Sequence, residues 1–310
     1  MRIAISGGSG LIGSALGADL RRDTAAGAEV VRLVRGPARA AGEISWDPVG
    51  SGLDPAALDG VDAVVHLSGA PVAGKRWTAA RKAQLRASRI DSTRALVTAM
   101  TAASAQPGPS PNGRASPGVL VCGSAIGFYG DTAGRVVDES SPPGTGFLAD
   151  LVRDWEAAAQ AAAPAGIRVV SIRSGIVLAR RGGMLGQLML PFKLGLGARI
   201  GSGSQYLSWI SLSDEVRAIR FVLDHAELSG PVNLTAPTPV TNAEFTSALA
   251  RALGRPALLT APAPVMRAAL GEVATELLGS IRAVPAKLTG AGFTFKHPDI
   301  ATALSAIVAL

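Results

Sequence analysis

Three glycines near the amino terminus have a spacing that suits phosphate binding. Gly7, Gly10 and Gly13 follow the apolar run Arg2–Ser6, and a segment of helical periodicity begins directly after them. In a strand–turn–helix unit, the first glycine permits a tight turn, the second lets the backbone approach a diphosphate, and the third lets the helix pack against the sheet. The helix amino terminus then offers free N–H groups to the phosphates. This context favours a dinucleotide site over an ordinary glycine-rich turn.

The end of the second predicted strand, Glu29–Val34, indicates which dinucleotide would bind. Sites for NAD place a carboxylate about 20 residues beyond the glycines, where it accepts hydrogen bonds from the ribose hydroxyls. Here Glu29 stands at the start of the strand, and only Arg32 and Arg35 stand near its end. A guanidinium can pair with the 2′-phosphate of NADP through two charge-assisted hydrogen bonds. The sequence therefore favours NADP over NAD, the alternative being that Arg35 is an ordinary surface arginine.

Short apolar runs alternate along the chain with longer segments of helical periodicity. Continuous apolar strands separated by helices predict a parallel sheet covered on both faces, which is an α/β fold of the doubly wound Rossmann type. The strands predicted in this part are Arg2–Ser6, Glu29–Val34, Ala63–Leu67, Val119–Cys122 and Arg168–Ile172, and the main helices are Ala79–Met100, with one break, and Leu148–Ala163.

The pattern changes after residue 178, where glycine-rich stretches interrupt the alternation. A strand at Tyr206–Ile210 and a helix at Asp214–Leu223 are expected to return to the main sheet, and Pro231–Leu234 is expected to add one more strand. A helix over Thr241–Leu253, with Thr241 or Asn242 as its N-cap, then opens a mostly helical tail.

Two domains are expected from the length and from this change of pattern. A NAD(P)-binding domain is predicted over residues 1–235, with residues 178–205 partly in a smaller lobe, and a carboxyl-terminal substrate lobe over residues 236–310. The segment Ser104–Gly118 is rich in Pro, Ser and Gly and nearly free of apolar side chains. It predicts a flexible surface loop and not a domain linker, because sheet-like sequence continues after it.

Beyond the glycine loop, a series of short runs extends through most of the chain. These runs are Val65–Ala70, Lys75–Trp77, Gly123–Gly130, Arg173–Leu178, Leu190–Gly197, Ile200–Gly203, Trp209–Ile210 with Asp214, Pro285–Leu288 and Ala291–Phe293. Together they resemble the extended short-chain dehydrogenase/reductases, and within them an atypical subgroup described as epimerase family proteins. The carboxyl-terminal part of that subgroup is similar to a domain of unknown function (DUF1731). The resemblance covers nearly the whole chain except Ser104–Gly118.

The resemblance implies a Rossmann domain followed by a small, mostly helical lobe that takes a small-molecule substrate, such as a nucleotide sugar. It also implies cofactor contacts at the ends of successive strands. These contacts are the loop residues Gly7, Ser9, Gly10, Leu11, Ile12 and Gly13, then Val34 and Arg35 beside the adenosine ribose, Leu67, Ser68 and Gly69 after a later strand, Arg89, and Ile176 near the nicotinamide.

The usual catalytic motif of this superfamily is missing. Its members use Tyr-x-x-x-Lys, in which the tyrosine acts as general acid or base, together with an upstream serine. The fourth residue after Tyr129 is Ala133, and the fourth after Tyr206 is Ile210. The region Phe147–Val152, where the motif should fall, holds neither Tyr nor Lys.

Ser124 and Tyr129 are the candidate substitutes for this motif. Ser124 follows a predicted strand, where the superfamily keeps its catalytic serine, and Tyr129 lies five residues further on. Either hydroxyl could reach a substrate oxygen, or Tyr129 could pack with its hydroxyl satisfied and Ser124 could cap the backbone. Two hypotheses follow: an NADP(H)-dependent oxidoreductase or epimerase, and a non-catalytic NADP-binding sensor or interaction protein.

Other polar residues near the strand ends have simpler interpretations. Lys75, Arg76 and Trp77 follow a strand and could hold an anionic or ring-shaped substrate, or form a surface loop. His66 lies inside an apolar strand and predicts a structural histidine. Asp214 stands at a helix start and predicts an N-cap.

Composition excludes several classes of protein. The single cysteine, Cys122, forms no internal disulfide, and the three histidines lack metal-ligand spacing, so no metal site is expected. The chain has no apolar run of about 18 residues and no signal-peptide pattern, so a cytoplasmic protein is expected. The net charge is +7. Because no recognised nucleic-acid motif accompanies this charge, a solvated basic surface is favoured and no nucleic-acid partner is expected.

Overall fold

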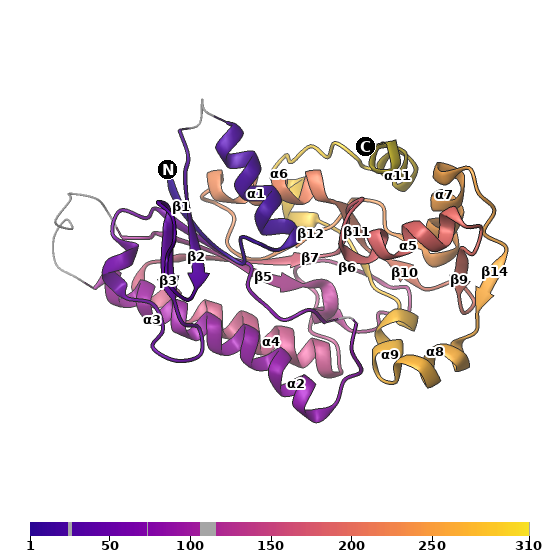
Figure 1. Ribbon diagram of the computed structural model, residues 1–310, viewed down its shortest axis with the longest axis horizontal. Helices are drawn as coiled ribbons and strands as arrows, with labels where there is room; N and C mark the ends of the chain where they lie inside the picture. Colours follow the sequence, from indigo (N-terminus) through magenta and orange to yellow (C-terminus); the bar gives the residue numbers. More distant parts are fainter. Residues whose placement is uncertain (24–26, 73, 106–115, 310) are drawn as a thin grey trace.

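A seven-stranded parallel sheet forms the centre of the protein (Figure 1). The computed structural model describes residues 1–23, 27–72, 74–105 and 116–309. The strand order is β12-β7-β5-β4-β1-β2-β3, and each adjacent pair is parallel. This order confirms the predicted Rossmann-type fold. The strands are β1 (Arg2–Ser6), β2 (Glu29–Arg35), β3 (Glu43–Trp46), β4 (Ala63–His66), β5 (Val119–Ala125), β7 (Arg168–Ser174) and β12 (Gly230–Leu234).

The strand order reverses at β1, which lies between β2 and β4. The connections that leave β1 and β4 at their carboxyl ends therefore run to opposite sides of the sheet. In open α/β sheets, such a reversal opens a crevice in which ligands bind. The fold thus points to the loops after β1, β2 and β4 as the place to look for a site.

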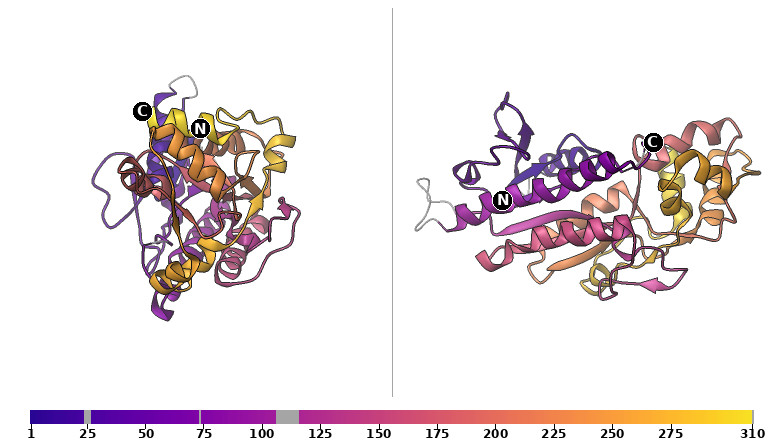
Figure 2. Two further views of the ribbon diagram at one scale, coloured as in Figure 1. Left: turned by 90° about the vertical axis from the view of Figure 1, so that its right-hand side faces the viewer. Right: turned by 90° about the horizontal axis from the view of Figure 1, so that it is seen from below.

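Helices cover both faces of the sheet, as the apolar strands require (Figures 1 and 2). Alternate strand residues face opposite sides, so that Ile5 joins one apolar core and its neighbour Ala4 joins the other. The first face is covered by α1 (Leu11–Arg22) and α6 (Leu212–Asp224), and the second by α2 (Ala79–Arg86), α3 (Ser92–Ser104) and α4 (Phe147–Gln160).

The predicted helix Ala79–Met100 is confirmed together with its break. A π-helical turn, η3 (Ala87–Asp91), separates α2 from α3. At this turn the Ser92 hydroxyl donates to the Ser88 carbonyl at 2.8 Å, so a side chain takes up a helix carbonyl where the regular ladder changes.

The edge strand β3 has no counterpart in the sequence prediction. Only Trp46 of its four residues is buried, because the strand lies at the sheet edge and half of it faces solvent. A run with one buried side chain gives no apolar signal.

Short strand pairs lie outside the main sheet and correct one prediction. The expected strand Tyr206–Ile210 is divided at Ser208 into β10 (Tyr206–Leu207) and β11 (Trp209–Ser211), and neither joins the seven-stranded sheet. The Ser208 hydroxyl donates to the Ile281 carbonyl and accepts from the Ala283 amide, so this residue is tied to the tail of the chain. The pairs are β10 with β13 (Val240–Thr241), β11 with β8 (Ile176–Leu178), β9 (Ala198–Ile200) with β14 (Leu259–Ala261), and β6 (Val136–Val137) with β15 (Arg282–Ala283).

Helices from the second half of the chain gather beyond the carboxyl ends of the strands (Figures 1 and 2). A separate apolar cluster, which includes Phe192, Trp209, Phe245 and Leu304, holds several of them together. The helices of this part are α5 (Gly183–Lys193), α7 (Asn242–Leu253), α8 (Ala263–Leu270), α9 (Val273–Leu278) and α11 (Ile300–Ala309), whereas α10 (Ala286–Gly290) packs against β12 of the main sheet.

The caps of two helices test the sequence prediction in opposite ways. Thr241 is the N-cap of α7 and forms a capping box with Glu244, as the sequence predicts. The N-cap of α6 is Ser211 and not Asp214, which lies inside the first turn. Asp214 is fully buried, where it accepts hydrogen bonds from the amides of Lys296 and His297.

Two further predictions concern the loop at 104–118 and membrane-spanning helices. The predicted flexible loop at 104–118 falls mainly on residues 106–115, which lie outside the described residues. Within the described part of the chain, no helix combines the length and apolar character needed to cross a bilayer.

Candidate functional site

The glycine loop joins β1 to α1 and leaves no room for side chains at two of its glycines. A Cβ at Gly7 would lie 2.6 Å from the Leu67 carbonyl oxygen, and Gly7 also has a positive φ of 70°. A Cβ at Gly13 would lie 2.4 Å from the Gly7 carbonyl oxygen. Gly10 is the N-cap of α1 and supplies no side-chain cap, so the first amides of α1 stay available to a ligand.

A groove of about 660 Å³ opens in front of this loop. Its walls come from the loops after β1, β2, β3 and β4 and from one side of α2. Such a volume and a glycine-lined floor suit a dinucleotide. Of the residues predicted to contact a cofactor, those lining the groove are Gly7, Ser9, Gly10, Val34, Arg35, Leu67, Ser68 and Gly69.

The remaining predicted cofactor residues lie outside the groove lining. Leu11, Ile12 and Gly13 form the first turn of α1 directly after the loop. The Arg89 guanidinium packs against Gly69, where an added Cβ would lie 3.1 Å from its central carbon. Ile176 begins β8 and is half-buried.

The two arginines near the end of β2 differ in their partners. Arg32 forms an ion pair with Glu43 at 2.5 Å. The pKa of Glu43 is lowered, first by the hydrogen bond from the Arg39 amide and also by the charge of Arg32. Arg35 is exposed at the groove and has no ion pair or side-chain hydrogen bond within the described part of the chain. The positive charge of Arg35 is therefore available to a ligand, whereas that of Arg32 is already balanced.

Several groove residues escaped the sequence analysis. Trp46, Pro48 and Val49 come from β3 and the turn after it, and Arg81 and Gln84 come from α2. The run Trp46-Asp47-Pro48 is a strand end followed by a turn former, which was the available signal. Because β3 was not predicted, the sequence did not indicate that this turn lies at the groove.

Ser124 lies at the end of β5 in a buried ionic network. Its hydroxyl donates to Glu156 Oε1 at 2.5 Å. Arg173 donates from Nε and Nη2 to the same carboxylate, each at 2.8 Å, and is only 3% exposed. Such a two-pronged pair satisfies both buried charges and fixes the carboxylate in place.

Tyr129 belongs to the same network and is also 3% exposed. Its hydroxyl donates to Asn233 Oδ1 at 2.8 Å and accepts from Arg173 Nη1 at 3.0 Å. Burial raises the pKa of Tyr129, and the nearby Arg173 charge opposes that shift without cancelling it. The described residues that line the groove include neither Ser124 nor Tyr129.

The region of the missing Tyr-x-x-x-Lys motif forms the start of α4. The ring of Phe147 packs edge-on against Trp77 with centroids 5.1 Å apart, and the Lys82 ammonium lies 5.1 Å from the Phe147 centroid. The start of this region therefore carries an apolar ring, and the region supplies no Tyr or Lys of its own.

The segment Lys75–Trp77 contacts protein on two of its three side chains. Trp77 is 9% exposed and donates from its indole N–H to the Val72 carbonyl at 3.0 Å. Arg76 donates to the carbonyls of Ala268 and Ala269 in the last turn of α8. This arrangement agrees with the surface-loop interpretation for the exposed Lys75 and Arg76, whereas Trp77 belongs to the apolar core.

His66 at the end of β4 is fully buried, as expected of a structural histidine. Its ring nitrogens are hydrogen-bonded to Ser6 Oγ at 2.6 Å and to Ser92 Oγ at 3.3 Å. Burial lowers the pKa of His66 to about 4, so the ring is neutral at physiological pH. Within the described residues, no three His, Cys, Asp or Glu side chains gather as a metal site would require.

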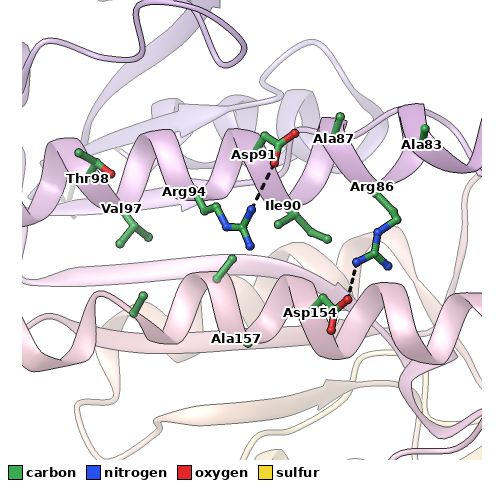
Figure 3. A pocket seen from close by; sticks show the side chains of 12 residues that line it. Ala83, Arg86, Ala87, Ile90, Asp91, Arg94, Val97, Thr98, Asp154 and Ala157 are labelled. Carbon is green, nitrogen blue, oxygen red and sulfur yellow. Dashed lines mark hydrogen bonds and ion pairs between the residues drawn. The ribbon is translucent and has the colours of Figure 1, made fainter.

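A second hollow of about 660 Å³ lies between α2–α3 and α4 (Figure 3). Alanines line much of it. Arg86 pairs with Asp154 across the hollow, and Arg94 pairs with Asp91 at 3.5 Å. Because both arginines are balanced by carboxylates, this hollow offers less to an anionic ligand than the groove at the glycine loop.

Comparison with known proteins decides the family. Residues 3–234 match the NAD dependent epimerase/dehydratase family, and residues 261–307 match a domain of unknown function (DUF1731). The chain belongs to the NAD dependent epimerase/dehydratase family. This assignment confirms the resemblance carried by the sequence motifs, including the similarity of the tail to DUF1731.

Family members align with this chain along almost its whole length. Epimerase family protein Mb2239 of Mycobacterium bovis is 50% identical over 303 residues, which are 97% of this chain and 96% of that protein. Human epimerase family protein SDR39U1 is 36% identical over 313 residues, with both chains covered completely.

Solved structures of other proteins agree with the fold. The crystal structure of human SDR39U1 (isoform 2) with NADPH has a TM-score of 0.86 and 34% identity, and covers 100% of this chain and 99% of that chain. UDP-N-acetylglucosamine 4-epimerase from Bacillus cereus has a TM-score of 0.74 at 18% identity, covering 100% and 98%, and supports the fold alone.

Proposed function

We propose that the protein binds NADP(H) in the groove and acts as an oxidoreductase or epimerase on a small-molecule substrate. The observation that carries the proposal is the exposed, unpaired guanidinium of Arg35 at the end of β2. The nearest carboxylate in sequence toward the next strand, Glu43, is already paired with Arg32. A 2′-phosphate beside Arg35 would meet a cation that no carboxylate pairs with among the described residues.

A relative supports the choice of cofactor. Human SDR39U1, at 34% identity and a TM-score of 0.86, was crystallised with NADPH. The glycine loop would hold the diphosphate by its backbone amides, as helix amino termini do. When bound, the cofactor would supply hydride transfer to or from a substrate carbon.

The substrate would lie between the groove and the helices beyond the strand ends. Ser124 and Tyr129 remain the proposed hydroxyl groups for the reacting substrate oxygen. Because both hydroxyls are engaged with Glu156, Arg173 and Asn233, catalysis by either would require a substrate atom to replace one of these partners. This exchange of hydrogen-bond partners would make the Ser124 or Tyr129 hydroxyl available to the substrate oxygen.

The same network favours a second candidate function. A chain in which Phe147 opens α4 and both candidate hydroxyls are satisfied could bind NADP(H) without turning over a substrate. In that case it would act as a sensor or interaction protein whose ligand is the cofactor. Steady turnover of NADPH by a substrate, reduced in the Ser124→Ala or Tyr129→Phe variant, would reject this alternative.

Cofactor affinity tests the proposal directly. The expected result for the intact protein is tighter binding of NADPH than of NADH, measured by isothermal titration calorimetry. The Arg35→Gln variant should lose about tenfold or more in NADPH affinity, because a charge-assisted contact contributes about 1.5–3 kcal/mol, and should bind NADH unchanged.

The control is Arg32→Gln, which removes an arginine already paired with Glu43. Its loss of NADPH affinity should be smaller than that of Arg35→Gln. Absence of binding of both dinucleotides to the intact protein would reject a cofactor role for the groove. Equal affinity for NADPH and NADH would reject the preference for NADP.

A further inference from the structure

The segment from Lys75 to Arg89 carries six cationic side chains and no carboxylate. The structure distributes them to different neighbours. Arg76 donates to carbonyls of α8, Lys82 pairs with Glu272, and Arg86 pairs with Asp154. Lys75 is exposed. Arg81 and Arg89 remain. Arg81 lines the groove, whereas Arg89 lies behind the groove lining and packs against Gly69.

Arg81 and Arg89 are held by adjacent backbone carbonyls in the loop after β4. Arg89 Nη1 donates to the Ala70 carbonyl at 3.0 Å, and Arg81 Nη2 donates to the Pro71 carbonyl. Arg81 Nη1 also donates to Gln84 at 2.6 Å. Within the described residues, neither guanidinium has a carboxylate at ion-pair distance. Two positive charges are therefore kept close together with only neutral acceptors.

This arrangement is electrostatically unfavourable without an anion. Burial lowers the pKa of Arg89 to about 10, and the positive charge of Arg81 adds to that shift. A guanidinium offers five N–H donors, so neutral carbonyls satisfy only part of its capacity. Arg81 Nε is buried and has no hydrogen-bond partner. An unsatisfied buried donor costs free energy, which a bound anion nearby would recover.

The position of the pair relative to the glycine loop indicates which anion fits. Arg81 lines the same groove as Gly7 and Gly10. Because Gly69 has no side chain, the Arg89 guanidinium can pack against it, where an added Cβ would lie 3.1 Å from the central carbon of the guanidinium. The strands β4 and β2 lie on opposite sides of β1. Arg81 and Arg89 therefore flank the loop on one side, and Arg35 flanks it on the other.

We propose that Arg81 is an anion-binding residue of the groove wall and contacts the diphosphate of the bound dinucleotide, with the charge of Arg89 behind it. The backbone amides of α1 would bind the diphosphate from one side, and Arg81 would reach it from the other. Arg35 would hold the 2′-phosphate. This inference rests on the proposed function, because it assigns a contact for the ligand of the same groove.

The experiment compares four probes on intact protein: NADPH, NADH, ADP and adenosine 2′-monophosphate. The Arg81→Gln variant should bind NADPH, NADH and ADP about tenfold more weakly, because one charge-assisted contact to the diphosphate is lost. Its affinity for adenosine 2′-monophosphate should be unchanged. The Arg35→Gln variant should show the reverse selectivity, weakening NADPH and adenosine 2′-monophosphate while leaving NADH and ADP unchanged.

A matched control lies on the same helix. Arg86→Gln changes the same residue type five positions along, on the side that faces Asp154 (Figure 3). It should bind all four probes like the intact protein. Arg81→Lys should recover part of the lost ADP affinity, because it restores the charge without the planar fork. Circular dichroism of each variant verifies that its total secondary structure matches that of the intact protein.

Two results would overturn the inference while leaving the proposed function in place. One is an Arg81→Gln variant that binds NADPH and ADP as tightly as the intact protein. The other is an equal loss for ADP and adenosine 2′-monophosphate, which would assign Arg81 to the adenosine. Failure of the intact protein to bind any of the four probes would instead reject the proposed function.

Discussion

Glu215 lies in the interior of the protein with one of its two carboxyl oxygens hydrogen-bonded. The Ser174 hydroxyl donates to Oε1 at 2.6 Å, and Oε2 has no partner in the described part of the chain. Burial raises the pKa of Glu215 to about 8, and the hydrogen bond from Ser174 offsets only part of this increase. Together with the neutral ring of His66, this residue shows that the interior of the sheet and helices favours uncharged side chains unless a full ion pair forms, as in Arg173–Glu156.

This buried carboxyl predicts a loss of stability at alkaline pH. Its folded-state pKa of about 8 lies above the ordinary value of 4.5, so the folded state binds more protons between these values. The stabilisation is fully present below pH 4.5 and is lost as the pH rises through 8. The Glu215→Gln variant should therefore be more stable than the intact protein at pH 8.5, by about 1–3 kcal/mol in free energy of unfolding. Urea denaturation between pH 5 and 8.5 measures the difference.

The control for this prediction is Glu227→Gln, which changes an exposed carboxylate near the end of α6. Its free energy of unfolding should follow the pH dependence of the intact protein. If Glu215→Gln and Glu227→Gln gave parallel curves, a protonated Glu215 in the folded state would be ruled out.

At the scale of elements, α1 carries two glycines with opposite surroundings. A Cβ at Gly13 would lie 2.4 Å from the Gly7 carbonyl oxygen, which is backbone and cannot move without opening the loop. A Cβ at Gly17 would meet only the Arg21 guanidinium at 3.4 Å, the end of a flexible side chain. The amino-terminal turn of the helix is thus fixed by packing, whereas its middle carries a glycine that costs helix stability.

These surroundings predict opposite effects of the same substitution. Gly17→Ala should stabilise the protein by about 0.5–1 kcal/mol, because alanine favours the helix and the Arg21 side chain can move aside. Gly13→Ala should destabilise it and also weaken nucleotide binding, because the loop must shift. Chemical denaturation of both variants compares the two directly. A loss of stability in Gly17→Ala, or unchanged stability in Gly13→Ala, would show that these contacts do not decide the stability of the two variants.

Across the whole molecule, the wall of the groove is tied to the helices beyond the strand ends. Arg76 donates to the last carbonyls of α8, where a cation also interacts favourably with the helix dipole. Lys82, on α2, pairs with Glu272, which directly precedes α9. The loop after β4 therefore contacts both the groove and the carboxyl-terminal helices, which couples the cofactor side to the proposed substrate side.

Removal of this link should loosen α8 without unfolding the sheet. The Arg76→Ala variant is expected to show faster amide hydrogen exchange in α8 and α9, because the last carbonyls of α8 lose their partner. The exchange of α7, which is held by its own capping box and by α11, should stay unchanged. The exposed Lys75→Ala variant serves as control. Equal protection of α8 in both variants would mean that Arg76 does not hold this helix.

The sequence by itself determined the features that depend on neighbours along the chain. The glycine spacing, the apolar strands, the Thr241 cap and the absence of Tyr-x-x-x-Lys are local patterns, and local backbone preferences and burial suffice to interpret them. The same holds for His66, because an apolar strand buried on both faces leaves its ring no access to solvent. The edge strand β3 was missed because a single buried residue gives no periodic signal.

Only the tertiary structure decided which polar groups are free. Glu43 balances Arg32 and leaves Arg35 unpaired, although both arginines look equivalent in the sequence. Ser124 and Tyr129 meet Glu156 and Asn233, which lie 32 and 104 residues away. The electrostatic state of a side chain depends on charges within a few ångströms in space, and the packing of distant segments sets those neighbours.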